Sequence, residues 1–566
     1  MALLVAVLLL PAAGRAPLER AEIYFVDGAR GMVESGDYLV PRYRGEAFFD
    51  KPPLTYWLIA AAFRSFGFTL DAARLVPAVA AILAVLATIG LGTRLFDRET
   101  ALSGGLALAT TAAFMSFGRI AMSDMLLTLW TTLGMGLGVS WMRGAAARAP
   151  GVGLALGAVL GLGFLTKGPV ALVFVGLGLL ALVGWRQLVA SISRATGVGL
   201  GFCLSGLPWF ALVAARLGLE PLRYFFLREN LERFAGETYD AERSPVYYVG
   251  VLLALGLPWS PLLALSLWRL WRARQTPRSP SDRAALDLWR FVALLLVPLS
   301  LSRGKIDYYL LPLWPALSLV TAWTLRGPWS RPERAFARLL LLAVAGGLFA
   351  LPAASGLVPA AWLPEPHVQS GARLALWVVA SALVAGAWWF RPMLLAGMFA
   401  TASALVFFLV SGFFIPAVRR AQPNDAIVND ILRERSFEPE LRLAYCEDPT
   451  RVARDLLFEA RLAATERCDL WNPAASHYPF LILVAEGQQE TLRSATRFVG
   501  RYTYLPATLT TLRRLAQGLS PDTLVLLANY STDEPEARKR VRRDRKHRIQ
   551  ERERRGAPPP GAGSDP

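Results

Sequence analysis

The sequence predicts a polytopic α-helical membrane protein of about 13 transmembrane helices, followed by a small C-terminal α/β domain. Hydrophobic residues make up 54% of the 566 residues and charged residues only 18%, whereas about a quarter of an ordinary soluble protein is charged. Long apolar runs also fill the first 415 residues, and a polar stretch follows them. These runs, together with a count of only three cysteines, exclude disordered, collagen-like and disulfide-stabilised classes.

A helix that crosses a bilayer needs about 20 mostly apolar residues. Thirteen segments meet or approach this criterion: 1–13, 75–91, 102–117, 125–141, 151–165, 169–184, 197–215, 246–268, 288–301, 309–325, 339–351, 374–390 and 393–416. The first segment is short and has no basic residue before it, so we interpret it as a clipped first span or as a span with a missed upstream start codon, rather than as a cleaved signal peptide.

Arginines in short loops predict the orientation of the spans, because basic residues accumulate on the cytoplasmic side. Alternate loops hold Arg94 and Arg98, Arg143 and Arg148, Arg186 and Arg194, five arginines between Arg269 and Arg283, and four between Arg326 and Arg338. This alternation requires that segment 52–68 lies on the outer surface as an interfacial helix. An odd number of spans then places everything after residue 416 outside the cell.

Three regions follow from these patterns. Residues 1–416 form the transmembrane domain, and their first outer loop, 15–70, is expected to carry catalytic residues. Short apolar runs between polar helix-like stretches predict a soluble extracytoplasmic α/β domain over 417–532. It contains Cys446 and Cys468, and whether they pair in an oxidising compartment stays open, because sequence alone gives no distance. Residues 533–566 are predicted to form a disordered basic tail. Within it, residues 538–555 contain 11 Lys and Arg and 3 acidic residues, and they supply much of the net charge of +17.

Ionisable residues at membrane edges are the candidates for function, because burying them is costly unless they are paired or used. On the predicted outer face, Glu22 and Asp124 are placed to take a proton from an incoming nucleophile. Charge-assisted hydrogen bonds from cations on the same face would hold an anionic group such as a phosphate; these cations are Lys51, Lys167, Arg233, Arg303 and Lys305. Together they describe group transfer from a lipid phosphate.

Simpler interpretations stay open for each of these residues. A single Lys or Arg beside a span often extends to lipid headgroups, and Glu22 and Asp124 are alternatively ion-pair partners of Arg30, Arg119 or other bases. Trp57 and Trp259 fit interface aromatics better than sugar platforms. His367 and His477 have no ligand spacing, so no metal ligand is assigned. A transporter or flippase is the alternative function, but the charges gather at one face and no repeat is apparent.

The order of short motifs resembles membrane glycosyltransferases of the C superfamily that use polyprenyl-phosphate sugars, the group of lipid A aminoarabinose transferases and protein O-mannosyltransferases. The motifs that carry the resemblance are Ala29-Arg30-Gly31-Met32, Glu34-Ser35-Gly36-Asp37, Asp50-Lys51-Pro52-Pro53, Arg119 to Asp124, Thr166-Lys167-Gly168, Arg233-Phe234, Ser302-Arg303-Gly304-Lys305 and Tyr309-Leu310-Leu311-Pro312. One such tetrapeptide is weak evidence, but eight in order are strong.

The resemblance implies an inverting single displacement, in which an envelope lipid, glycan or protein attacks a sugar carried on undecaprenyl phosphate at the outer face of a bacterial inner membrane. It assigns catalysis to Glu22 and Asp124, carrier-phosphate binding to Arg119 with the five cations above, and substrate binding to Asp50, Tyr56 and Tyr309. No nucleic-acid partner is expected. The chain departs from the family in two places: Ala21 occupies the position of a first-loop Asp, and Asn230 follows Glu229 where a His is usual. A metal bridged by that His is therefore doubtful, and no cofactor is assigned.

Overall fold

A computed structural model describes the chain in two units, Met1–Arg419 and Arg420–Pro566. The described residues are 1–10, 19, 21–43, 46–143, 150–232, 243–273, 279–302, 304–358, 360, 363–388, 392–420, 424–437, 442–445, 465–467, 480–485, 497–504 and 522–528. Each unit is considered by itself below.

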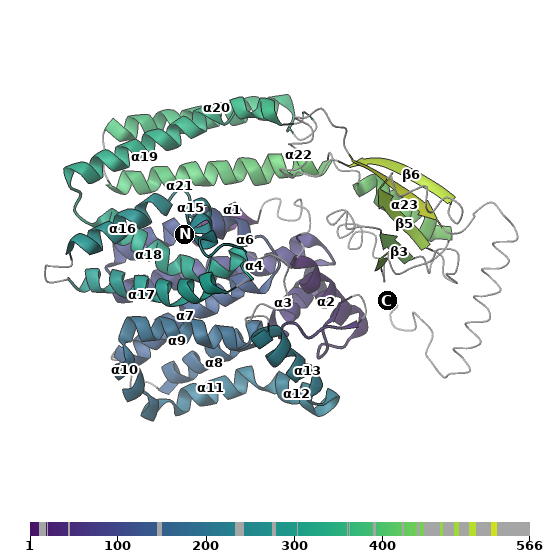
Figure 1. Ribbon diagram of the computed structural model, residues 1–566, viewed down its shortest axis with the longest axis horizontal. Helices are drawn as coiled ribbons and strands as arrows, with labels where there is room; N and C mark the ends of the chain where they lie inside the picture. Colours follow the sequence, from purple (N-terminus) through teal and green to yellow (C-terminus); the bar gives the residue numbers. More distant parts are fainter. Residues whose placement is uncertain are drawn as a thin grey trace, which may run out of the picture. The chain divides into compact units, whose positions relative to one another are not determined.

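The first unit is almost entirely helical (Figure 1). Its N-terminal part contains α1 (Ala2–Leu9), α2 (Glu22–Ser35), the short strands β1 (Arg42–Tyr43) and β2 (Glu46–Ala47), and α3 (Leu54–Phe66). The next part contains α4 (Leu70–Leu95), α5 (Arg98–Ala109), α6 (Ala112–Phe117), α7 (Ser123–Arg143), α8 (Pro150–Lys167), α9 (Pro169–Val183), α10 (Trp185–Ala190), η3 (Ile192–Arg194), α11 (Thr196–Gly206), α12 (Pro208–Leu217), α13 (Glu220–Arg223) and the π-helix η4 (Tyr224–Glu232).

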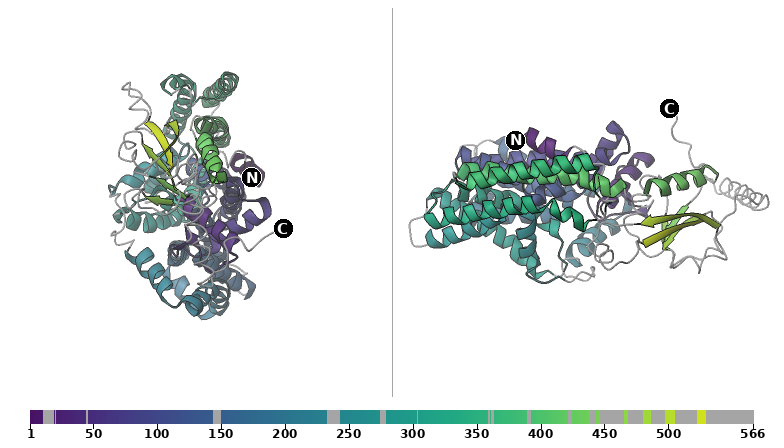
Figure 2. Two further views of the ribbon diagram at one scale, coloured as in Figure 1. Left: turned by 90° about the vertical axis from the view of Figure 1, so that its right-hand side faces the viewer. Right: turned by 90° about the horizontal axis from the view of Figure 1, so that it is seen from above.

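The remaining elements of the first unit include two 3₁₀ segments, a second π-helical segment and a long helical hairpin. They are α15 (Tyr247–Leu255), α16 (Ser260–Arg272), α17 (Pro280–Leu301), η6 (Asp307–Leu313), α18 (Trp314–Arg326), α19 (Arg331–Ala350), η7 (Ala353–Leu357), α20 (Pro366–Trp388), α21 (Pro392–Leu409), η9 (Val410–Phe414) and α22 (Ile415–Arg420). Helices α19 and α20 pack along each other, and α21 packs against α20 (Figure 2).

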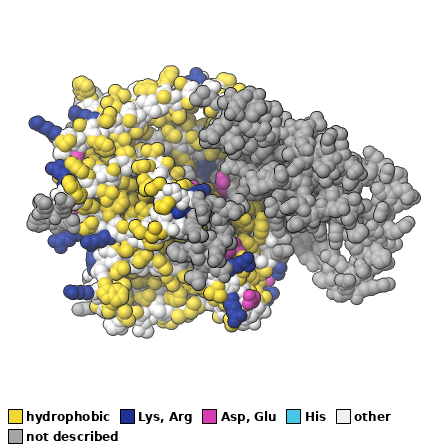
Figure 3. Space-filling view, in the orientation of Figure 1, with side chains coloured by type: hydrophobic (Ala, Val, Ile, Leu, Met, Phe, Trp, Pro, Cys, Tyr) yellow, Lys and Arg dark blue, Asp and Glu magenta, His cyan; other side chains and the backbone are white. Residues whose placement is uncertain are grey.

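Six helical segments among the described residues are long and apolar enough to cross a membrane, and the number rises to nine if each of three bent helix pairs is one span. The polytopic membrane class is therefore supported. Apolar side chains cover much of the visible surface of the first unit in Figure 3, as expected of a surface that faces lipid. The bent pairs turn by 111° between α9 and α10, by 45° between α11 and α12, and by 113° between α15 and α16.

Several predicted spans are not continuous helices. The segment 102–117 is interrupted at Thr110 and Thr111, which separate α5 from α6, and the segment 309–325 begins with η6 before α18. At the first break, Ser403 Oγ donates to the backbone carbonyl of Thr110 at 2.6 Å, and the backbone N–H of Ala112 donates to the carbonyl of Leu257 at 3.1 Å. Partners from distant helices thus satisfy backbone groups that the break exposes, as an apolar environment requires.

The core of the first unit has two parts that matter for the site. Trp259 is buried against Phe399, with ring centroids 5.7 Å apart, and so belongs to the interior rather than to an interface belt. A second cluster joins Leu54, Phe164, Trp209, Phe210 and Phe225. This aromatic cluster connects α3, α8, α12 and η4, and it fixes the ends of these four elements relative to one another.

The second unit contains α23 (Asn424–Phe437) and a five-stranded sheet. The strands are β3 (Arg442–Tyr445), β4 (Thr465–Arg467), β5 (Phe480–Ala485), β6 (Arg497–Tyr504) and β7 (Asp522–Ala528), in the order β4-β3-β5-β7-β6. Strand β3 runs parallel to β4 and β5, whereas β7 is antiparallel to β5 and β6. The register pairs Leu443 with Leu481 and Ile482 with Leu527. Cys446, Cys468 and the basic tail lie outside the described residues.

Candidate active site

Glu22 is fully buried in the structure. Its carboxylate accepts hydrogen bonds from Arg74 Nε at 2.8 Å and Arg74 Nη2 at 2.6 Å, and its side chain has no exposed surface. The backbone N–H of Ala121 donates to Oε1 at 2.8 Å, and that of Glu19 to Oε2 at 3.1 Å. Glu22 therefore ties α2, α4 and the turn before α7 together. This geometry favours a positioning role, and its role as a base stays a prediction.

The turn that Glu22 holds leads directly to Asp124, in the first turn of α7. Lys167 Nζ, at the end of α8, donates to Asp124 Oδ1, and the two side chains are only 13% and 4% exposed. Lys167 Nζ also lies 5.1 Å from the ring centroid of Tyr309, at the start of the segment that leads into α18. The structure thus brings together three residues that were predicted separately: Asp124, Lys167 and Tyr309. Asp124 and Lys167 form an ion pair beside the Tyr309 ring.

Arg119 lies in the same turn and is 8% exposed. Its guanidinium carbon is 5.5 Å from the ring centroid of Phe407 on α21. Burial, with the nearby charge of Arg74, lowers the pKa of Arg119 to about 10. The guanidinium stays charged at neutral pH in a partly desolvated place, where an added anion would be favourable.

A second group of polar residues surrounds Lys51, just before α3. Lys51 Nζ donates to the backbone carbonyl of Asp50 at 2.7 Å and lies 3.4 Å from Glu229 Oε2 on η4. Tyr224 donates its hydroxyl to Asp50 Oδ1 at 3.1 Å. Burial and the two carboxylates raise the pKa of Tyr224 to about 12 and hold the pKa of Tyr56 above its ordinary range. Both phenols stay protonated and can donate hydrogen bonds.

The two groups flank the same π-helix. Phe225 of η4 packs against Gly168, which follows Lys167, while Tyr224 and Glu229 of η4 lie in the Lys51 group. Tyr56 packs on Phe25 of α2, with ring centroids 5.1 Å apart, and α2 begins with Glu22. The predicted acids and cations therefore gather at one end of the helices, around η4 and α2.

Of the three remaining predicted cations, the structure describes only Lys305. Lys305 is 3% exposed, and its ammonium donates to the backbone carbonyl of Arg243 at 2.9 Å and to that of Ser302. It secures the loop before η6, and its phosphate-binding role stays a prediction. Arg233 and Arg303 lie outside the described residues. Within the described ranges, no group of three or more His, Cys, Asp or Glu side chains is placed to hold a metal ion.

Sequence reasoning missed Arg74 and Tyr224. Arg74 immediately precedes the predicted span 75–91, and a lone arginine there is itself a signal, because such a charge needs a buried partner. Tyr224 had no signal beyond its place near Glu229.

Gly168 fixes the turn between Lys167 and α9, and it adopts a backbone φ of +71°. A Cβ at this position would lie 2.5 Å from Phe225 Cζ. Gly168→Ala is expected to lower the thermal unfolding temperature of the purified chain, because the left-handed backbone alone costs about 1–2 kcal/mol. Gly176→Ala on the same helix is the control, since no atom lies within 4 Å of its added Cβ. Equal unfolding temperatures for the two variants would contradict the role of this turn.

The fold and the clustered charges define a class: a polytopic helical membrane protein with a polar site at one end of its helices. A family model described as dolichyl-phosphate-mannose-protein mannosyltransferase matches residues 50–209. This match includes Lys51, Asp124 and Lys167.

Two curated relatives name a more particular activity. The undecaprenyl phosphate-alpha-4-amino-4-deoxy-L-arabinose arabinosyl transferase 1 of Sodalis glossinidius is 33% identical over 321 residues, which cover 56% of each chain. The enzyme of the same name, without a number, from Pseudomonas paraeruginosa is 33% identical over 308 residues, covering 53% of this chain and 54% of the relative. The chain spans about half the length of the curated relatives it matches.

The crystal structure of ArnT from Cupriavidus metallidurans bound to undecaprenyl phosphate has a TM-score of 0.71 at 21% identity, covering 93% of this chain and 97% of that one. The apo structure of the same protein gives 0.68. The chain therefore has the ArnT fold. The resemblance to polyprenyl-phosphate-sugar glycosyltransferases that its motifs predict is confirmed.

Proposed function

We propose that this protein is a glycosyltransferase that moves a sugar from a polyprenyl-phosphate carrier to an envelope acceptor. The observation that carries the proposal is the meeting of a buried acid, Asp124, with Lys167 and Tyr309, beside the second polar group around Lys51. The first donor to test is undecaprenyl phosphate-linked 4-amino-4-deoxy-L-arabinose, because the curated relatives are named for it. The first acceptor to test is a lipid A-like glycolipid.

In the proposed reaction, an acceptor oxygen attacks the anomeric carbon from the side opposite the carrier. The bond from that carbon to the carrier phosphate oxygen breaks, the electron pair leaves with the phosphate, and the configuration inverts. Asp124 accepts the proton of the acceptor if the acceptor is a hydroxyl. Lys51, Lys167 and Arg119 stabilise the negative charge of the leaving phosphate, and Tyr309 contacts the sugar, whereas the Tyr56 side chain is fully buried in this structure.

The transporter or flippase alternative is less well supported. Broken helices occur in transporters, and this chain has three bent helix pairs. The predicted acids and cations, however, gather near the ends of helices rather than at their middles, and the matching curated relatives are named as transferases.

The topology belongs to the same proposal. We place about 13 spans in a bacterial inner membrane, with the Asp124 end of the helices and an α/β domain over 417–532 facing the periplasm. The tail 533–566 is then on the periplasmic side of the membrane and has no nucleic-acid partner. Phosphatase fusions at residues 232 and 440 are expected to be active and fusions at residues 146 and 276 inactive, and the reverse pattern would overturn the orientation.

Mass spectrometry of envelope lipids and glycans from a deletion strain tests the activity itself. The expected result is the loss of one sugar mass from an envelope glycolipid, restored by the wild-type gene. Unchanged masses for every envelope lipid, glycan and glycoprotein would reject the proposal, and an accumulated untransported intermediate would favour the transporter.

Lys51→Ala is expected to reduce transfer at least about 100-fold, because it removes a charge-assisted hydrogen bond to the carrier phosphate as that phosphate leaves. Transfer by purified enzyme from a synthetic carrier-linked sugar is the measurement. Arg216→Ala is the control, since Arg216 is 58% exposed and pairs with Asp37 at 3.2 Å. If the Lys51→Ala variant transfers sugar at the wild-type rate, the assignment of Lys51 to phosphate binding is wrong.

A further inference from the structure

A cavity of about 620 Å³ lies at the end of the helices opposite the candidate active site. Helix α4 has Arg74 near its start and Phe96, which lines the cavity, just after its end; its 26 residues span about 39 Å. Helix α18 likewise follows η6, which carries Tyr309, and ends at Arg326 in the cavity wall. The cavity is thus separate from the groups around Asp124 and Lys51.

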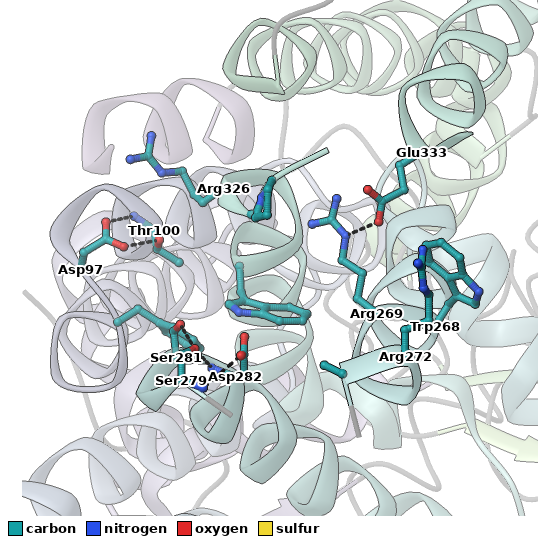
Figure 4. A pocket seen from close by; sticks show the side chains of 15 residues that line it. Asp97, Thr100, Trp268, Arg269, Arg272, Ser279, Ser281, Asp282, Arg326 and Glu333 are labelled. Carbon is teal, nitrogen blue, oxygen red and sulfur yellow. Dashed lines mark hydrogen bonds and ion pairs between the residues drawn. The ribbon is translucent and has the colours of Figure 1, made fainter. Parts of the chain in front are cut away.

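Three arginines and three tryptophan or phenylalanine rings line this cavity, together with three acids (Figure 4). Arg272 lies 4.8 Å from the ring centroid of Trp268, which keeps its guanidinium extended along the wall. Arg269 Nε donates to Glu333 Oε1 at 2.7 Å. Among the residues that the structure describes, Arg269 Nη2 is buried and has no hydrogen-bond partner.

The three acids balance the formal charge of the three arginines, but each acid is engaged by a helix N-terminus. Asp97 caps α5 and accepts from the backbone N–H groups of Glu99 and Thr100; the bond from Thr100 holds the pKa of its carboxyl below the usual range. Asp282 is part of a capping box with Ser279 at the start of α17. Glu333 forms the same arrangement with Ser330 at the start of α19. Three helix N-termini, each with its partial positive charge, therefore converge on the cavity.

The surroundings are strongly basic and lie at a membrane edge. The described residues of segments 94–99, 269–273, 279–283 and 326–338 together contain nine arginines and four acids. Lys and Arg side chains are visible along the left margin of the first unit in Figure 3, beyond the apolar surface. Trp268 and Trp271 are 38% and 58% exposed, as is typical of tryptophans at the headgroup level.

We propose that this cavity binds the phosphate of an anionic phospholipid headgroup from the leaflet at this end of the helices. A phosphate oxygen between Arg272, Arg326 and Nη2 of Arg269 would satisfy that buried donor and make charge-assisted hydrogen bonds. At Arg326 it would replace an ion pair with Glu99, whose side chain is 67% exposed and whose pairing is therefore weak. The volume is sufficient for a phospholipid headgroup, and basic pockets between helices are recognised sites for acidic lipids. This inference does not depend on the transfer reaction.

Native mass spectrometry of the full-length protein in detergent, titrated with phosphatidylglycerol, tests the site. The wild type is expected to retain phosphatidylglycerol in preference to phosphatidylcholine, and Arg272→Gln/Arg326→Gln is expected to weaken that binding at least about tenfold. Arg186→Gln/Arg194→Gln removes the same two charges from another loop and is expected to bind like the wild type. Unchanged binding by the first variant, or an equal loss in the control, would overturn the proposal.

Two further arms distinguish the source of the anion and guard against misfolding. Inorganic phosphate in the millimolar range is expected not to displace the lipid; displacement would assign the cavity to a soluble anion instead. If the double variant does not fold, Arg272→Gln alone replaces it, because the Arg272 side chain is exposed. The single variant is expected to lose about half of the retained lipid, and full retention would count against the site.

Discussion

Arg74→Met is expected to destabilise the folded protein by about 3–5 kcal/mol, because it leaves the Glu22 carboxylate buried without its counter-charge. The Arg74 and Glu22 side chains are 1% and 0% exposed, and two hydrogen bonds join them. The loss is expected as a markedly lower thermal unfolding temperature of the purified protein in detergent.

A matched set of variants separates this buried pair from a general loss of charge. Glu22→Gln/Arg74→Met removes both charges and is expected to be more stable than Arg74→Met alone. Arg30→Met breaks a pair with Glu34, whose side chain is 52% exposed, and is expected to cost less than about 1 kcal/mol. An Arg74→Met protein that unfolds at the wild-type temperature would mean that the pair does not hold α2 and α4 together.

The pairing of Glu22 with Arg74 also shows the limit of reading ion pairs along a sequence. Arg30 was one expected partner of Glu22, but Arg30 pairs with Glu34 at 2.6 Å instead. Residues four apart on a helix are neighbours whatever the tertiary fold, so a local partner is available at no cost in chain entropy. Contacts across 52 residues, such as Glu22 with Arg74, depend on helix packing that local pattern does not contain.

Hydropathy predicted where the membrane helices lie better than where they break. The apolar run 102–117 has no Pro or charge at Thr110, yet α5 ends there. The break is stabilised by Trp259 Nε1, which donates to Thr110 Oγ1 at 3.2 Å, and by Ser403 from α21. Hydropathy reflects the free energy of moving side chains from water into an apolar environment. A helix break instead requires specific hydrogen-bond partners, which here come from residues 149 and 293 positions away in the sequence.

The motifs predicted the candidate site well for residues at helix ends. Asp124 is the second residue of α7 and Lys167 is the last residue of α8, so two apolar runs that pack together place these two side chains at the same level. Lys305 lies in a loop, where its ammonium is surrounded by backbone carbonyls that no motif encodes.

Asp124→Asn is expected to reduce the turnover number for transfer by about 100- to 10,000-fold, the usual contribution of a positioned acid or base. The amide keeps the shape of the carboxylate but cannot accept the proton of the acceptor. Transfer by the purified variant at saturating donor and acceptor is the measurement. Asp37→Asn is the control, because Asp37 pairs with the exposed Arg216.

A structural role for Asp124 gives a different pattern, because its carboxylate also accepts from Lys167. If the carboxylate served only to hold Lys167, Lys167→Met would reduce turnover as much as Asp124→Asn, and the double variant would be no worse than either. If Asp124 accepts the proton and Lys167 binds the leaving phosphate, the losses combine, because each residue stabilises a different charge in the transition state. A double variant as active as Asp124→Asn alone, in protein with the wild-type unfolding temperature, would therefore mean that Asp124 only positions Lys167. Lys167, not Asp124, would then be the catalytic residue.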